Sequence, residues 1–118
     1  MMKKLVLGLA LIFILVSSQA FAQHRESTDG LTSDTLVYTA RSGENLGFCG
    51  IVVAANGTDA ATATVYDATS ATGKKFTTIT VAAGETLGGA MYPSCVKAKT
   101  GLFLDVGTNT TAWVIWTR

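Results

Sequence analysis

The sequence is poor in the side chains that carry out chemistry. It has a single histidine, His24, and charged residues make up only 14% of its 118 residues. No Ser-His or Cys-His dyad can be built around His24, which lies in a polar stretch near the N-terminus. Two cysteines without a nearby histidine cannot complete a tetrahedral zinc site. The carboxylates stand mostly singly, in loops or at strand ends. We therefore expect no enzymatic activity, no cofactor and no metal site.

The sequence also lacks long hydrophobic runs, except at its N-terminus. A short start with two lysines precedes the apolar residues 5–16, and Ala-Phe-Ala occupies positions 20–22. This order is typical of a bacterial-type secretory signal peptide, whereas a transmembrane helix needs about 20 apolar residues. We expect residues 1–22 to be a signal-peptide helix that is cleaved after Ala22. The mature chain would then be secreted or periplasmic, without a membrane anchor.

An excess of charge of one sign is missing as well. Without residues 1–22 the chain keeps seven Lys and Arg against eight Asp and Glu, a net charge of −1. Nucleic-acid binding needs a cluster of positive charges to neutralise phosphates. We therefore expect neither a nucleic-acid partner nor electrostatic docking on anionic lipid.

Helical periodicity is absent after residue 22, and proline occurs once, at Pro93. Short segments with alternating apolar and polar residues take its place, separated by turn residues. We expect strands over residues 35–41, 46–53, 62–67, 75–81, 86–91, 95–99, 102–106 and 111–117. The pattern predicts an all-β fold, an antiparallel two-sheet sandwich of seven or eight short strands, with a small β-barrel as the alternative. Pro93 fits an edge strand or a corner.

Two of these segments differ in their predicted burial. Phe48, Ile51 and Val53 belong to a nearly continuous apolar run, which predicts a strand buried on both faces. Residues 62–67 alternate strictly, which predicts a strand with one face in water.

Both cysteines, Cys49 and Cys95, lie in the mature part of the chain. An even number of cysteines in an exported chain predicts a disulfide. The bond would tie the second expected strand to the start of the sixth, which suits a bond between the two sheets or across one end of the sandwich.

The mature chain divides into two parts. Residues 23–34 are polar, with Leu31 as the one large apolar side chain, which predicts a flexible N-terminal arm. An arm that orders on a partner subunit is the alternative. Residues 35–118 are expected to form the β-sandwich domain.

Aromatic side chains offer the only candidate ligand contacts. Trp113 and Trp116 point to opposite faces of the last expected strand, so at least one of them belongs to the core. Trp113 and Phe103 are the aromatics that we expect to be available on the surface. They would suit a carbohydrate-binding module, with a glycan as ligand.

The expected strands and turns follow one another in a characteristic order in two stretches, GFCGIVVAANGTDAATATVYDATSATGKKFTTITVAAGETL and KTGLFLDVGTNTTAWVIW. A Gly-rich apolar strand, an Asn/Ala-rich loop, a strand ending in Tyr-Asp and a Val-Ala-Ala-Gly-Glu turn precede a Thr-Gly-Leu-Phe-x-Asp-Val strand and an aromatic last strand. In this order, residues 47–116 resemble small β-sandwich virion structural or capsid decoration proteins of tailed phages and prophages. The resemblance implies a β-sandwich with a structural role. The signal peptide and the disulfide depart from that family and move the expected setting outside the inner membrane.

These observations predict a secreted, non-enzymatic structural or interaction module. It would associate with itself or with a surface protein through exposed strand edges or through the arm. A carbohydrate-binding module is the alternative, and a small hydrolase is a weaker third.

Overall fold

The structure is a computed structural model in which residues 25–118 are described. The predicted signal peptide and the first two residues of the predicted arm lie outside the described residues. Eight strands run through the described part: β1 (Glu26–Ser27), β2 (Thr35–Thr39), β3 (Gly47–Ala55), β4 (Ala61–Asp67), β5 (Lys74–Val81), β6 (Leu87–Lys97), β7 (Gly101–Val106) and β8 (Thr110–Thr117). Residues 25–118 include no helix long and apolar enough to cross a bilayer.

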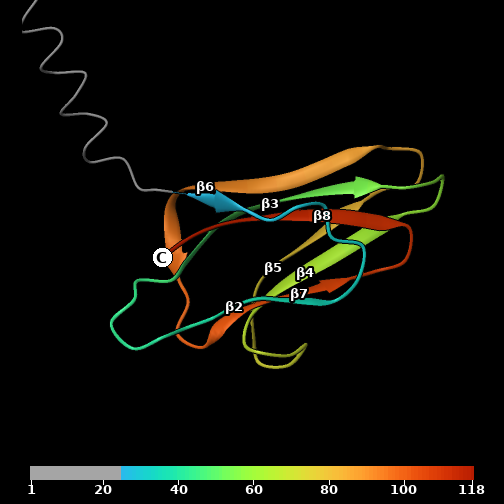
Figure 1. The fold of residues 1–118 in the computed structure, drawn as a ribbon. Helices are drawn as coiled ribbons and strands as arrows, with labels where there is room; N and C mark the ends of the chain where they lie inside the picture. Colours follow the sequence, from blue (N-terminus) through green and yellow to red (C-terminus); the bar gives the residue numbers. More distant parts are fainter. Residues whose placement is uncertain (1–24) are drawn as a thin grey trace, which may run out of the picture.

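The strands form two antiparallel sheets of four strands, stacked face to face (Figure 1). Sheet A has the order β1-β8-β3-β6, and sheet B has the order β2-β7-β4-β5. Every strand pair is antiparallel. The predicted two-sheet sandwich is therefore confirmed.

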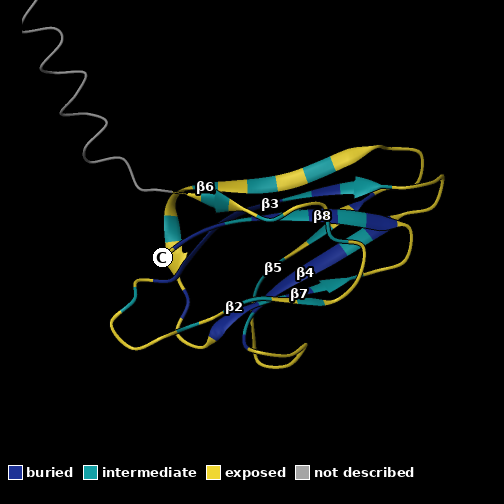
Figure 2. Cartoon of the chain, in the orientation of Figure 1, coloured by how far each residue is buried: buried dark blue, intermediate teal, exposed yellow. Residues whose placement is uncertain are grey.

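The core lies between the sheets and follows from the alternation of side chains along each strand. In β7, Leu102 and Leu104 are fully buried, whereas Phe103 between them faces outward. In β8, Ala112 and Val114 are fully buried in the same way. Figure 2 shows the buried stretches on β4 and β8, whereas most loops are exposed. Phe48 of sheet A stacks on Phe76 of sheet B at a centroid distance of 5.2 Å and so joins the two layers.

The burial of the two central strands agrees only in part with the prediction. β3 is buried over most of its length, as expected for a strand between β8 and β6. The prediction of a wet face on β4 was wrong for Thr64 and Tyr66, which are 9% and 8% exposed. β4 lies between two neighbours, and their side chains cover this face. The Thr64 hydroxyl lies 2.9 Å from that of Thr78, and the Lys75 ammonium lies 5.9 Å from the centre of the Tyr66 ring.

A bulge in β2 changes the predicted direction of one aromatic side chain. The register shifts between Leu36, which pairs with Phe103, and Tyr38, which pairs with Leu102. An unbroken alternation along residues 35–41 predicts Leu36 and Tyr38 on one face. Because of the bulge, Leu36 points outward and Tyr38 packs against the core and Trp116.

The two strands expected over residues 86–91 and 95–99 are one strand, β6. In place of the gap expected between the two strands, β6 has a large bulge, because Phe48 pairs with Val96 and Gly50 with Met91. Four residues of β6 therefore lie opposite the single residue Cys49. β6 is the edge of sheet A, so the prediction that Pro93 lies in an edge strand is confirmed.

Cys49 and Cys95 form the predicted disulfide. The predicted position between the two sheets was wrong, because the bond joins neighbouring strands of one sheet. The bulge brings the two Cα atoms to 4.2 Å. Cys49 is fully buried, and a buried disulfide is compatible with an oxidising periplasmic or extracellular setting.

Residues 26–31 of the expected arm lie along β8, and Asp34 contacts β7, so this segment does not lie apart from the domain. Glu26 and Ser27 form β1, and Leu31 makes an isolated bridge with Ala112. The Thr28 hydroxyl accepts a hydrogen bond from the Val114 N–H. This segment contains regular structure that its polar composition did not predict, because its pairing uses backbone groups more than side chains.

Candidate interaction surface

The two aromatic side chains expected to contact a ligand lie on opposite faces of the sandwich. Trp113 belongs to the outer face of sheet A, and Phe103 to the outer face of sheet B. A Cβ added to Gly30 would lie 3.1 Å from the Trp113 ring, so the N-terminal segment covers part of this ring. Both side chains are partly buried. The structure therefore does not bring them together into one site.

The carboxylates of Asp34 and Asp105 form a pair that the sequence did not reveal. They come from the segment before β2 and from β7. Burial raises the pKa of Asp105, and the charge of Asp34 and a hydrogen bond to it raise it further, against an opposing effect of Lys75. Asp34 also accepts a hydrogen bond from the Val106 N–H at 2.8 Å. The two carboxyl groups of retaining glycosidases are roughly 5 Å apart. A hydrogen-bonded pair is closer than this, so Asp34 and Asp105 do not have the spacing of a glycosidase site.

Asp67, at the end of β4, has a structural role. Its carboxylate accepts hydrogen bonds from the backbone N–H groups of Lys99, Thr100 and Gly101, at distances of 2.8 to 3.2 Å. Burial alone would raise the pKa of Asp67, but these hydrogen bonds and the charge of Lys74 lower it more, so the pKa lies below its usual value. Asp67 thus fixes the turn between β6 and β7.

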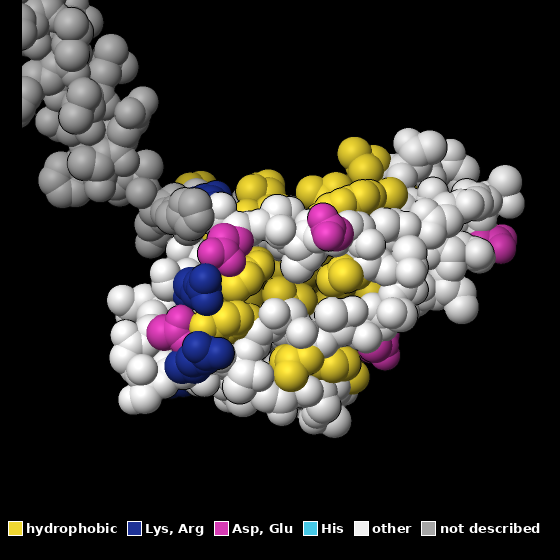
Figure 3. Space-filling view, viewed as in Figure 1, with side chains coloured by type: hydrophobic (Ala, Val, Ile, Leu, Met, Phe, Trp, Pro, Cys, Tyr) yellow, Lys and Arg dark blue, Asp and Glu magenta, His cyan; other side chains and the backbone are white. Residues whose placement is uncertain are grey.

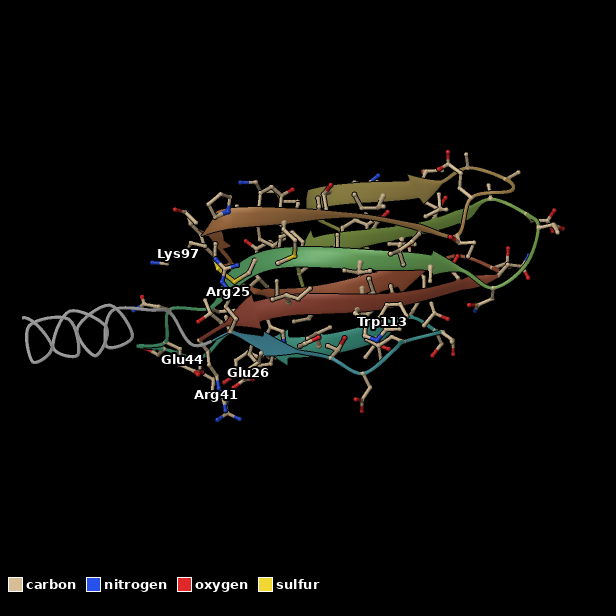
Figure 4. The ribbon with its side chains drawn as sticks, turned by 90° about the horizontal axis from the view of Figure 1, so that it is seen from above. Arg25, Glu26, Arg41, Glu44, Lys97 and Trp113 are labelled. Atoms are coloured by element: carbon tan, nitrogen blue, oxygen red, sulfur yellow. A yellow bond between two sulfur atoms is a disulfide. The ribbon has the colours of Figure 1, made fainter. Side chains whose placement is uncertain are left out.

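Charged side chains gather at the end of the sandwich where β3 begins and β8 ends (Figure 4). The Tyr38 hydroxyl donates to Glu44 at 2.7 Å and lies 3.5 Å from an Arg118 nitrogen. Arg118 also lies 3.6 Å from the Glu26 carboxylate. These side chains therefore form hydrogen bonds and an ion pair mainly with one another.

The charges of residues 25–118 are unevenly distributed along the sandwich. All Lys and Arg side chains of this part belong to the end just described, hereafter the basic end, and Figure 3 shows those visible on one face. They are Arg25, Arg41, Lys74, Lys75, Lys97, Lys99 and Arg118. Four carboxylates, of Asp34, Asp59, Glu85 and Asp105, belong to the opposite end, hereafter the acidic end. Glu26, Glu44 and Asp67 also lie at the basic end, so this end has an excess of four positive charges, and the two ends of the sandwich differ in the sign of their charge.

A depression of about 210 Å³ lies at the basic end beside the disulfide. It is lined by Asn45, Leu46, Gly47, Cys95, Lys97 and Thr117. Lys97 is its one charged side chain, and a single cation without an aromatic platform does not define a class of ligand. Residues 25–118 hold no group of three or more His, Cys, Asp or Glu side chains placed to bind a metal ion.

The most accessible apolar surface follows the edge strand β6. Leu87 is 63% exposed and Met91 is 55% exposed, and both lie on the outer face of sheet A. Figure 3 shows hydrophobic side chains along this edge. Exposure alternates through residues 87–91, which we call the open half of β6. This half carries neither charge nor proline.

The rest of β6, residues 92–97, is protected against pairing with another strand. It contains Pro93 and the bulge, and it ends at Lys97. The Arg25 guanidinium donates hydrogen bonds to the carbonyls of Tyr92 and Pro93, at 3.2 and 2.8 Å. Proline, bulges and lysine are the features with which natural sheets block their edges. Their absence from the open half leaves one short, uncharged edge available.

Sequence reasoning predicted association through strand edges but did not identify this edge. Leu87-Gly88-Gly89-Ala90-Met91 has a weak strand pattern, and only the strand order shows that it lies at an edge.

Comparisons of the chain with protein-family models, with curated proteins and with solved structures found no match.

Proposed function

We propose that this chain is an exported, non-enzymatic structural or interaction module that associates through the open half of β6. The observation that carries this proposal is an edge with exposed Leu87 and Met91 and no protective feature. Strand addition to such an edge supplies backbone hydrogen bonds for affinity and side-chain contacts for specificity. The other edge strands are less suitable. β1 has two residues, β5 begins with two lysines, and β2 contains the bulge between Leu36 and Tyr38, which is one of the features that block an edge.

Two further features support this role. The buried disulfide and the predicted signal peptide both fit an oxidising setting outside the inner membrane. The resemblance to phage decoration proteins favours a structural module, here adapted to an exported surface or filament.

The test is photo-crosslinking of the exported protein in the cells that produce it. A photoreactive residue at position 87 is expected to give covalent adducts, either with a second copy or with another surface protein. The same residue at position 58, in the exposed loop after β3, is the control and is expected to give few adducts. If position 87 gives no more adducts than position 58, the proposed function is wrong.

Carbohydrate binding is the second candidate, and the observation that favours it concerns Phe103. This ring pairs across the sheet with Leu36 and Tyr66, which gives an apolar row beside Asp105 on the outer face of sheet B. Glycan-array binding that disappears in Phe103→Ala would support this function. Trp113→Ala tests the other face in the same assay, and absence of glycan binding by the wild-type protein would exclude both sites.

A further inference from the structure

We propose that the partner at the open half of β6 is a second copy of this chain, added antiparallel about a two-fold axis at Gly89. The two copies of sheet A would then form one continuous sheet of eight strands. This inference rests on the proposed function and specifies its partner and geometry.

The backbone groups of three residues in β6 face its free edge. The Ala55 N–H donates to the Thr86 carbonyl at 3.1 Å, so Thr86 faces β3. Backbone groups alternate in direction along a strand, and Leu87 pairs with Ala54 in the position without mutual hydrogen bonds. The N–H and C=O groups of Leu87, Gly89 and Met91 therefore point away from β3, toward the free edge.

The register of the new strand pair follows from the positions of these three residues. An axis at Gly89 places Leu87 opposite Met91 of the second copy, and Gly89 opposite Gly89. Each such pair of outward-facing residues exchanges two hydrogen bonds, which gives about six in total. Moving the axis by one residue in either direction leaves Leu87 or Met91 opposite a residue outside the open half. The register at Gly89 is thus the one that pairs all three residues.

The side chains fit this register. Leu87 and Met91 lie on the same outer face as Gly89, because they are separated by even numbers of residues. Each leucine would contact a methionine of the other copy across the new strand pair. Gly89 has no side chain to crowd the axis.

Charge favours the antiparallel over the parallel orientation. Glu85 lies two residues before Leu87, so the same register brings it level with Pro93 of the second copy. The carbonyl of Pro93 accepts a hydrogen bond from Arg25. The pairing therefore brings the Glu85 carboxylate of each copy beside the Arg25 guanidinium of the other copy, at two symmetry-related places. Antiparallel pairing also sets the basic end of one copy beside the acidic end of the other. Parallel pairing would set like charges side by side.

The interface is small. Five residues from each copy bury less than the roughly 800 Å² per partner of a typical stable complex. We therefore expect a dissociation constant on the order of 10 μM or weaker, which sedimentation velocity can measure.

Directional disulfide trapping with the mature, oxidised protein tests the orientation. Leu87→Cys and Met91→Cys are purified separately, checked for unchanged melting temperature, and oxidised alone or as a mixture. Opposed residues in such a pair have Cα atoms about 5.5 Å apart, within reach of a disulfide. Two copies of residue 87 would be about 14 Å apart, beyond reach. We expect a cross-linked dimer in the mixture and not in either variant alone.

The other outcomes overturn the inference in distinguishable ways. Cross-linking of Leu87→Cys with itself would indicate parallel pairing or an antiparallel pair with its axis at residue 87, and in both cases the inference fails while the proposed function stands. A monomer at all concentrations, without cross-linking in the mixture, would also overturn it. Photo-adducts at position 87 with a different protein would then leave the proposed function intact.

Substitution of Glu85 tests its predicted contact with Arg25 of the second copy. Glu85→Lys is expected to weaken dimerisation about tenfold, because it converts two attractions into repulsions. Asp59→Lys makes the same charge change in another loop of the acidic end, near Asn109, and is expected to have little effect. Equal effects of the two substitutions would refute the predicted contact of Glu85.

Discussion

Asp67 provides the most direct test of how this sandwich holds its turns. The turn from β6 to β7 presents three backbone N–H groups, of Lys99, Thr100 and Gly101, to one carboxylate on β4. Asp67→Ala removes the acceptor of all three groups. Asp67→Asn keeps one acceptor oxygen but removes the charge.

The expected size of the effect follows from the exposure of these bonds. A hydrogen bond to a charged acceptor contributes about 1.5 to 3 kcal/mol when buried. Water replaces the carboxylate at the two exposed N–H groups, whereas the Gly101 N–H is partly buried. After this discount for solvent we expect Asp67→Ala to lower the free energy of unfolding by about 2 kcal/mol. For a domain of this size the melting temperature would fall by about 10 °C.

The pH dependence gives a second, independent measurement. Because the pKa of Asp67 is lower in the folded than in the unfolded state, its charge stabilises the fold fully above the unfolded value of 3.8. This stabilisation is lost as the pH falls through the folded pKa. The difference between wild type and Asp67→Asn should therefore be largest near neutral pH and shrink below about pH 4.

Thermal unfolding followed by circular dichroism measures both effects, with Asp59→Ala as the control. Asp59 is an exposed loop carboxylate whose one hydrogen bond, from Asn109, is long at 3.4 Å. Its removal is expected to change stability by less than about 0.5 kcal/mol. If Asp67→Ala is no less stable than Asp59→Ala, or if the difference between Asp67→Asn and wild type does not depend on pH, the reasoning is refuted.

Two further predictions concern the disulfide and the acidic pair. The double variant Cys49→Ala/Cys95→Ala should lose about 4 kcal/mol of stability, because the bond closes a loop with a sequence separation of 46 residues. A loss below about 1 kcal/mol in thermal or denaturant unfolding would contradict the chain-entropy estimate. Asp105→Asn should increase stability at pH 7 by about 0.5 kcal/mol, because it removes the repulsion by Asp34 at an exposed site. Because the folded pKa of Asp105 is raised, this gain in stability should disappear at acidic pH, where the carboxyl group of the wild type is protonated. If the variant is no more stable than the wild type at pH 7, the prediction is wrong.

The fold class could be predicted because side-chain direction has a period of two in a strand. Leu102 and Leu104 in β7, and Ala112 and Val114 in β8, occupy the alternating positions that the sequence indicates, and they form the core. This information is local and does not depend on which strands become neighbours.

Bulges and strand order could not be predicted in the same way. The bulge in β2 reverses Tyr38, and the bulge opposite Cys49 sets the disulfide within one sheet. Both depend on where one strand has extra residues relative to its neighbour, which the alternation within a single strand does not show. The N-terminal segment escaped prediction for the same reason, since backbone groups of Thr28 and Leu31 pair with β8.

The candidate interaction surface could not be predicted either, because its identification depends on the strand order. Exposed strand edges follow from any open sandwich, but the residues that form them depend on which strand is last in each sheet. Likewise, the pairing of Asp34 with Asp105, and the three N–H groups facing Asp67, join residues far apart in the sequence. No spacing motif indicated either contact.

The contrast between the two halves of β6 supports association as a property of the native molecule. An edge that must stay monomeric needs protection along its whole length, because one unprotected stretch suffices for pairing. Here the protective features all lie in residues 92–97, where the contacts of Arg25 add to the effect of Pro93. The core between the sheets does not involve the outer edge of Leu87 and Met91, so the fold does not need these side chains to be apolar. The proposed partner strand would cover Leu87 and Met91, which lie outside the core.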